Sequence, residues 1–201
     1  MGWLFMRNLE GHGTPKAYLD DQFTFARPQV QCRVLATAMV GTRTYYAAVE
    51  QVTTMTGARE VCAVVCLVRY NLRDREGYVF GYKEMSEHAG PCEATCPAKV
   101  LDLLSPTDNV NALGWRARCR ANIAQRRAQR AKPVPRPGEI VVLAQPLLFR
   151  DGRSVARFEA VRRQGRTRGL VYRSAEGVLY AIPRLKACGY SIEPGPLLRS
   201  P

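Results

Sequence analysis

Residues 30–70 read VQCRVLATAMVGTRTYYAAVEQVTTMTGAREVCAVVCLVRY. Three runs in this stretch, 30–40, 44–52 and 60–70, are rich in β-branched, aromatic and small apolar residues, which favour strands. The first two runs are separated by a Gly-Thr pair, and a Thr-Gly pair precedes the third. Glycine is typical of turns because it accepts backbone conformations that other residues avoid. The stretch therefore predicts an antiparallel meander of three strands.

Helix signals flank this predicted sheet on both sides. Thr14 followed by Pro15 is typical of a helix start, because threonine caps free N–H groups and proline suits the first helical position. Pro97 is expected to open another short helix, and a longer one is predicted from about Asn109 to Lys132. We therefore expect residues 1–130 to form an α+β domain, an antiparallel sheet with helices, that ends in an arginine-rich helix.

The remaining chain is expected to form a second, smaller domain. Residues 131–138, AKPVPRPG, carry three prolines at alternate positions and predict a semi-rigid linker. Residues 139–201 contain about five short extended runs separated by glycine- or proline-containing turns. This spacing favours a small all-β barrel. The fold class predicted for the whole chain is therefore α+β, with a basic helix and a small barrel following the first sheet.

Positive charge is concentrated in the second half of the chain. Residues 113–201 hold 19 Lys and Arg against 5 Asp and Glu, whereas residues 1–112 hold 11 against 12. Such a one-sided distribution suggests a polyanion, an acidic protein surface or a membrane face as partner. The longest apolar run, residues 61–68, is too short to cross a bilayer. We therefore expect no membrane partner, and nucleic acid or an acidic protein surface instead.

Clustered arginines are the candidate contacts for nucleic acid. The predicted long helix carries arginines without acidic neighbours along it, so something outside the helix should offset their repulsion. A second cluster lies in the turn VRRQGRTRG, and Phe158, Tyr172 and Tyr180 would supply stacking surfaces if they face outward. A solvated cationic face is the alternative interpretation. The candidate binding residues are Arg116, Arg120, Arg126, Arg127, Arg130, Lys132, Arg162, Arg163, Arg166 and Arg168.

The seven cysteines suggest reduced thiols. Their number is odd, and the N-terminus does not read as a secretory signal, so we expect a cytoplasmic protein without a disulfide framework. One spacing, H-x3-C-x3-C-x22-C, could supply four ligands to a structural zinc ion. Ordinary buried cysteines are the alternative, and no other cofactor is indicated. The candidate zinc ligands are His88, Cys92, Cys96 and Cys119.

Signals for catalysis are sparse. Cys92 or Cys96 would need a lowered pKa and a base such as His88 to act as a nucleophile, and Glu84 and Glu87 could orient that histidine. The chain contains no phosphate loop, dinucleotide fingerprint or zinc-protease motif. We therefore expect a protein that is not an enzyme, with a small Cys/His-dependent enzyme as an alternative.

Residues 81–120 read GYKEMSEHAGPCEATCPAKVLDLLSPTDNVNALGWRARCR. Together with the start MGWLF and the run TYYAAVE, they resemble a family of uncharacterised proteins encoded by bacteriophages, plasmids and integrated elements. The resemblance carries no assigned activity, so it implies no catalytic residue. It implies the context of a mobile genetic element in a bacterial host, where DNA handling and inhibition of host defence are both common roles.

Two functions follow as hypotheses. The first is a non-enzymatic accessory protein that binds DNA or RNA through the basic helix and the β module. The second is an anti-defence inhibitor, anti-CRISPR or anti-restriction, whose basic half docks on a host nuclease complex. Many such inhibitors mimic DNA and are acidic, so the net charge of +13 argues against simple mimicry.

Overall fold

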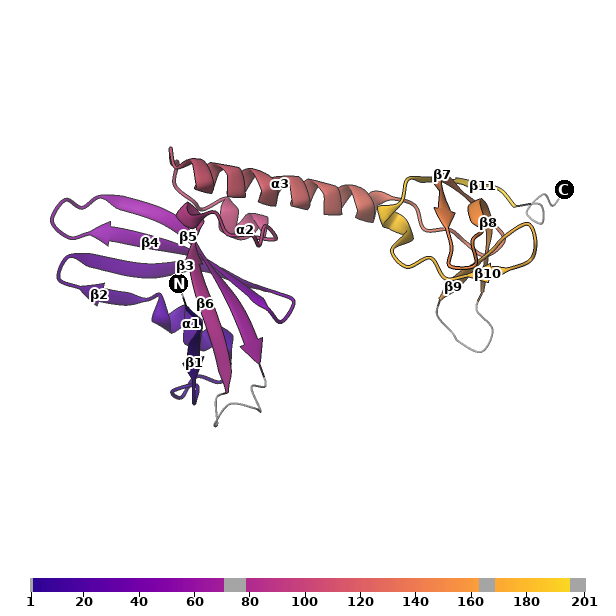
Figure 1. Cartoon of the computed structure of the whole chain (residues 1–201). Helices are drawn as coiled ribbons and strands as arrows, with labels where there is room; N and C mark the ends of the chain where they lie inside the picture. Colours follow the sequence, from indigo (N-terminus) through magenta and orange to yellow (C-terminus); the bar gives the residue numbers. More distant parts are fainter. Residues whose placement is uncertain (1, 71–78, 163–168, 196–201) are drawn as a thin grey trace. The chain divides into compact units, whose positions relative to one another are not determined.

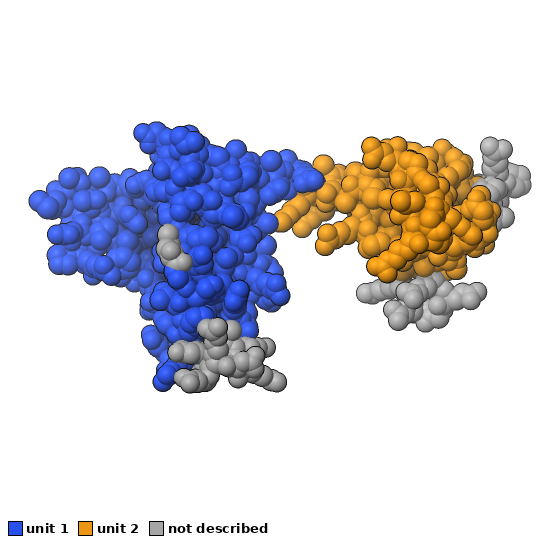
Figure 2. Space-filling model, viewed as in Figure 1, with its two compact units in different colours: residues 1–125 blue, residues 126–201 orange. Residues whose placement is uncertain are grey.

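The chain divides into two compact units, residues 1–125 and residues 126–201 (Figure 2). The computed structural model describes residues 2–70, 79–162 and 169–195. Each unit has its own sheet and its own hydrophobic core. The α+β class predicted from the sequence is confirmed.

The first unit is built on a six-stranded antiparallel sheet with the order β1-β6-β5-β4-β3-β2 (Figure 1). The predicted meander forms its centre, and the N-terminal strand returns to the edge, where Leu4 pairs with Tyr82. Gly81 allows this return, since a Cβ atom there would lie 2.7 Å from the Phe5 ring. The strands are β1 (Leu4–Met6), β2 (Phe25–Arg27), β3 (Val30–Val40), β4 (Thr44–Thr53), β5 (Arg59–Tyr70) and β6 (Phe80–Ser86).

The helices begin where the sequence provides caps. In α1 (Pro15–Gln22) the Thr14 hydroxyl accepts the N–H of Ala17 at 3.2 Å. The long helix α3 (Val110–Ala131) starts after Asn109, whose side-chain oxygen accepts the N–H of Ala112 at 3.0 Å. A short helix α2 (Ala98–Leu101) and a 3-10 turn η1 (Glu87–Ala89) precede α3. Among the described residues, no helix is long and apolar enough to cross a membrane.

Helices cover both faces of the sheet. Successive residues of a strand point to opposite faces, so Tyr45 and Tyr46 of β4 enter different cores. Tyr45 lies with Leu19 and Phe23 at α1, and its hydroxyl donates to Asp20 at 2.8 Å. Tyr46 packs on Trp115 of α3. Residues 45–49 of β4 are buried on both faces, and this part of the strand is therefore apolar without a polar alternation.

The edge of β5 extends past the end of β6 and is covered by loops. Ser105 pairs with Val61, since its hydroxyl accepts the Val61 N–H at 2.8 Å and its own N–H donates to the Val61 carbonyl at 2.9 Å. The Ala63 N–H donates to the Glu87 carboxylate at 3.0 Å. These contacts satisfy backbone groups that would otherwise be buried without partners. They also fix η1 and the loop between α2 and α3 beside the sheet.

The second unit is a five-stranded antiparallel sheet with the order β10-β9-β8-β7-β11. Phe158, Tyr172 and Tyr180 are at most 7% exposed and belong to its core, so they do not face outward, which was the condition for their use as stacking surfaces. Large aromatic rings are needed there because a unit this small has little other apolar surface to bury. The elements are β7 (Ile140–Leu148), β8 (Ser154–Arg162), β9 (Leu170–Arg173), β10 (Leu179–Tyr180), a 3-10 turn η2 (Leu185–Ala187) and β11 (Tyr190–Glu193).

The proline-rich segment 131–138 is attached to this second sheet. The Lys132 ammonium donates to the Cys188 carbonyl at 2.7 Å, and the Gly138 N–H donates to the Ala160 carbonyl at 2.7 Å. Pro135 is buried. The end of α3 and the segment that follows it are therefore held on the second unit by specific hydrogen bonds.

Candidate functional site

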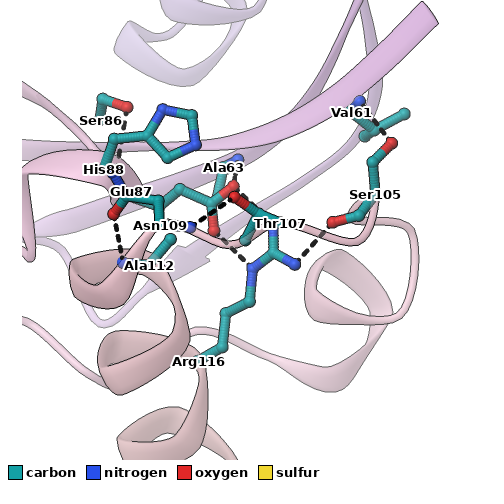
Figure 3. A network of polar contacts seen from close by, with 10 residues as sticks. All are labelled: Val61, Ala63, Ser86, Glu87, His88, Ser105, Thr107, Asn109, Ala112 and Arg116. Atoms are coloured by element: carbon teal, nitrogen blue, oxygen red, sulfur yellow. Dashed lines mark hydrogen bonds and ion pairs between the residues drawn. The ribbon is translucent and has the colours of Figure 1, made fainter.

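A buried ion pair joins η1 to the first half of α3 (Figure 3). The guanidinium of Arg116 donates to both oxygens of the Glu87 carboxylate, at 2.6 and 2.8 Å, and to the Ser105 carbonyl at 2.7 Å. Glu87 is fully buried and also accepts the Ala63 N–H. The hydrogen bonds of Arg116 to Glu87 raise the pKa of Arg116. Arg116, which the sequence predicted to lie on a binding surface, is thus bonded to Glu87 and Ser105 within the protein.

Other arginines in the first half of α3 also find partners within the protein. Arg120 lies 3.1 Å from Asp102, with both side chains exposed, and Arg118 donates to the Pro91 carbonyl at 3.3 Å. The loops around α3 therefore provide the compensation that the charge pattern of the helix required. We leave Arg116 and Arg120 out of any proposed binding surface for this reason.

The four predicted zinc ligands do not form one cluster in the described structure. Cys96 and Cys119 are fully buried in the core between the sheet and α3, where burial raises the pKa of both thiols. Cys92 is exposed, and His88 lies in η1. All seven cysteines are free thiols. The long spacing to Cys119 is thus explained by ordinary packing of α3 on the sheet.

The described residues contain a different group of metal-binding side chains. Glu60, Cys62 and His88 each offer one ligand atom, and these atoms lie within 4.8 Å of one another. Burial, and next the hydrogen bond to Glu60, raise the pKa of the Cys62 thiol to about 12. Sequence spacing missed this group because its members come from β5 and from η1. The signal available was Glu-x-Cys on a predicted strand, whose alternation places both side chains on one face.

The predicted nucleophiles lack the setting that a reactive thiol needs. A reactive cysteine requires a lowered pKa, whereas burial raises the pKa of Cys96. Glu87 is held by Arg116, and burial also raises the pKa of Glu84. The His88 ring points away from the Arg116 guanidinium (Figure 3). The described residues thus do not join these groups into a nucleophile and its base.

Several arginines of the second unit have no acidic partner in the described part of the chain. Arg126, Arg127 and Arg130, in the last turns of α3, are exposed and have no acidic partner among the described residues. Lys132 is half-buried and bonded to a carbonyl, and Arg162 is exposed at the end of β8. The remaining predicted residues, Arg163, Arg166 and Arg168, lie outside the described residues.

A cleft of about 290 Å³ brings several of these cations together. Among its described lining residues, four are cationic and none is acidic, in contrast to another cleft of the second unit, where Glu159 pairs with Arg173. Lys186 also donates to the Arg130 carbonyl at 3.2 Å, which holds η2 against the end of α3. The lining residues are Arg126, Gln129, Arg130, Arg184, Lys186 and Ala187.

Arg184 occupies an unusual backbone conformation in this cleft. Its φ of 60° is left-handed, a region that costs a residue with a side chain roughly 1–2 kcal/mol. Its carbonyl accepts the Ala187 N–H at 2.7 Å and so begins η2. Arg184 and Lys186 were missed in the sequence because they are isolated cations in a turn, and composition does not show which turn folds back on α3.

Comparison with protein families gives one match. The family model described as Domain of unknown function (DUF6927) matches residues 106–185, which is less than half of the chain. The matched segment begins four residues before α3 and ends at the first residue of η2, and it includes Arg116, Arg126, Arg130 and Arg184. No curated protein and no solved structure matches the chain. The chain is therefore similar, over α3 and most of the second sheet, to a domain of unknown function.

Proposed function

We propose that the protein is a non-enzymatic nucleic-acid-binding protein that contacts the phosphate backbone through its second unit. The observation that carries this proposal is the cleft lined by Arg126, Arg130, Arg184 and Lys186, with no acidic side chain among its lining residues. Like charges held together in one cleft repel each other, and a bound phosphate removes that repulsion. Arginine suits this role because its planar guanidinium can bind two phosphate oxygens at once.

The proposed mode of binding is electrostatic and tolerant of base sequence. Sequence-specific recognition of single-stranded RNA commonly uses exposed aromatic rings on which unpaired bases stack. The three rings that the sequence offered for this purpose are buried in the core of the second unit. Contacts with phosphate groups position a protein on nucleic acid but do not read its bases. We therefore expect duplex DNA of different sequences to bind with similar affinity.

The test is binding of the full chain to fluorescent duplex DNA and to single-stranded RNA at several salt concentrations. The slope of log K against log salt should be about −0.9 per neutralised phosphate of duplex DNA. Replacing Arg126, Arg130 and Arg184 together with alanine should weaken binding on the order of tenfold or more. It should also make the slope less negative by about 1 for each lost contact.

A matched control removes the same amount of charge from the first unit. Arg33, Arg59 and Arg120 are exposed arginines that already lie beside acidic side chains. Alanine at these three positions lowers the net charge by the same three units and should leave the affinity nearly unchanged. Equal loss in both triple variants would mean that overall charge, rather than the cleft, governs binding.

Binding to an acidic protein surface is the outcome that would replace this proposal. It would show as no retention of nucleic acid at low salt, together with recovery of a defined host nuclease complex from nuclease-treated lysate. The anti-defence hypothesis predicts that recovery, and the nucleic-acid hypothesis predicts that nuclease treatment abolishes it.

A further inference from the structure

We propose that Glu60, Cys62 and His88 bind a zinc ion in the first unit. One ligand atom from each residue lies within 4.8 Å of the other two. The three side chains bring an oxygen, a sulfur and a nitrogen donor to one point, and zinc accepts all three donor types. This inference does not depend on nucleic-acid binding, which is assigned to the other unit.

Two neighbouring elements bring these residues together. Glu60 and Cys62 are two positions apart on β5, and alternate residues of a strand share a face. The ladder of β5 and β6 ends at the pair of Val64 and Ser86, and η1 follows directly, so His88 lies close to this part of β5. Glu87, the residue before His88, instead bonds to Arg116.

The backbone that carries the histidine is firmly placed. The His88 N–H donates to the Ser86 hydroxyl at 3.3 Å, and the His88 carbonyl accepts from the Asn111 side chain at 3.1 Å. Gly90 ends η1 in the left-handed conformation, with φ of 62°, and its N–H donates to the Glu87 carbonyl at 2.9 Å. Two ligands on a central strand and one on a braced turn make a site that needs little rearrangement to bind an ion.

The three donor atoms suit zinc and leave one of its four coordination positions open. Thiolate and imidazole donors suit zinc better than magnesium or calcium, which prefer oxygen ligands. Bonds of about 2.0–2.3 Å in a tetrahedron place the ligand atoms roughly 3.5 Å apart. Binding therefore needs the ligand atoms at a spacing inside the 4.8 Å within which they lie, and the exposed Glu60 side chain has room to adjust. Three protein ligands leave the fourth position for water.

Cobalt(II) provides the test, because cobalt bound to a thiolate gives an intense near-ultraviolet absorption band. The full chain, first treated with a chelator, should bind one equivalent of cobalt with this band, and zinc should displace it. Cys62→Ser should abolish the band, and His88→Gln should weaken cobalt affinity more than about 100-fold, beyond the effect of a residue that only supports a ligand. Circular dichroism of each variant checks that the fold is retained.

Two substitutions serve as matched controls. Cys92→Ser changes an exposed cysteine, and His12→Gln changes the other histidine of the chain, so both should keep the band and the affinity. A wild-type protein without a thiolate band would overturn the proposal. Loss of the band in Cys92→Ser or Cys119→Ser would assign the metal to the four residues predicted from spacing, and this would also overturn it. DNA binding measured on the same samples should be unaffected by Cys62→Ser, so the two proposals fail separately.

Discussion

The two ends of α3 use the same amino acid in opposite ways. In the first half, the partly buried Arg116 pairs with the fully buried Glu87 and holds three segments of the first unit together. In the last turns, Arg126 and Arg130 are exposed and have no acidic partner among the described residues. The difference lies in the surroundings, since acidic side chains and carbonyls of nearby loops bind the arginines of the first half. An arginine count therefore gives the charge of a helix without showing which charges are available to a partner.

The largest expected effect comes from breaking the buried pair. Glu87→Ala leaves the Arg116 cation buried without its counterion, and removal of one partner of such a pair typically costs about 3–5 kcal/mol. Urea unfolding followed by circular dichroism measures this loss. The double variant Glu87→Ala with Arg116→Met should lose less than the sum of the two single variants. A loss below about 1 kcal/mol for Glu87→Ala would show that the pair does not hold η1 to α3.

Replacement of arginine by lysine at both ends of the helix tests the comparison directly. Arg116→Lys keeps the charge but cannot reach both carboxylate oxygens and the Ser105 carbonyl, so we expect a loss of about 1–3 kcal/mol. Arg130→Lys should change the free energy of unfolding by less than about 0.5 kcal/mol, as is usual for surface positions. Thermal unfolding of both variants in the same buffer gives the contrast. Equal losses of stability for Arg116→Lys and Arg130→Lys would mean that the two ends of α3 do not use arginine differently.

Two substitutions of Arg184 distinguish the effect of its charge from that of its backbone conformation. Arg184→Gly relieves the left-handed conformation and should raise the free energy of unfolding by up to about 1 kcal/mol, the gain being reduced by the greater freedom of glycine when unfolded. Arg184→Ala keeps the strain and should bring no gain. Both variants lose the same charge, so nucleic-acid binding should weaken equally. Unequal binding would mean that the turn geometry, rather than the cation, makes the contact.

The smallest effect is expected at the exposed pair of the first half. Asp102→Asn removes the partner of Arg120, and exposed ion pairs contribute roughly 0.2–1 kcal/mol. This loss should shrink at high salt because exposed charges are screened. Denaturant unfolding at low and high salt measures the difference. A loss of stability as large as that of Glu87→Ala would mean that the exposed pair contributes as much as the Glu87–Arg116 pair. Burial would then not explain the strength of the Glu87–Arg116 pair.

Local patterns predicted the regular elements well. The three central strands and α3 begin and end within about a residue or two of the predicted positions, because alternation, turn residues and caps act over short distances. The three-residue strand β1 was not predicted. It is stabilised by pairing with residues 80–82 and by packing of Phe5 on Gly81, and neither contact is visible in its own sequence.

The candidate sites depended on contacts between distant segments and were therefore predicted less well. The basic character of the second half was evident from the sequence. The partner of Arg116, however, is Glu87 of η1, which lies 29 positions earlier in the chain. The metal-binding prediction found His88 and joined it to cysteines that are near in sequence. The fold instead brings it close to Glu60 and Cys62, because η1 begins where β6 leaves the edge of β5. Spacing rules predict ligands that lie on one local segment of the chain. They fail where folding brings ligands from two separate elements together.

The edge position of β1 has a consequence for the order of folding during synthesis. Its partner β6 is the last strand of the first sheet to be made, so β1 leaves the ribosome long before it can pair. Until residues 80–86 emerge, the outer edge of β5 stays open, and such an edge can pair with another nascent chain. The strand made first is thus completed last, and the cell must keep the nascent sheet apart from its neighbours during that interval.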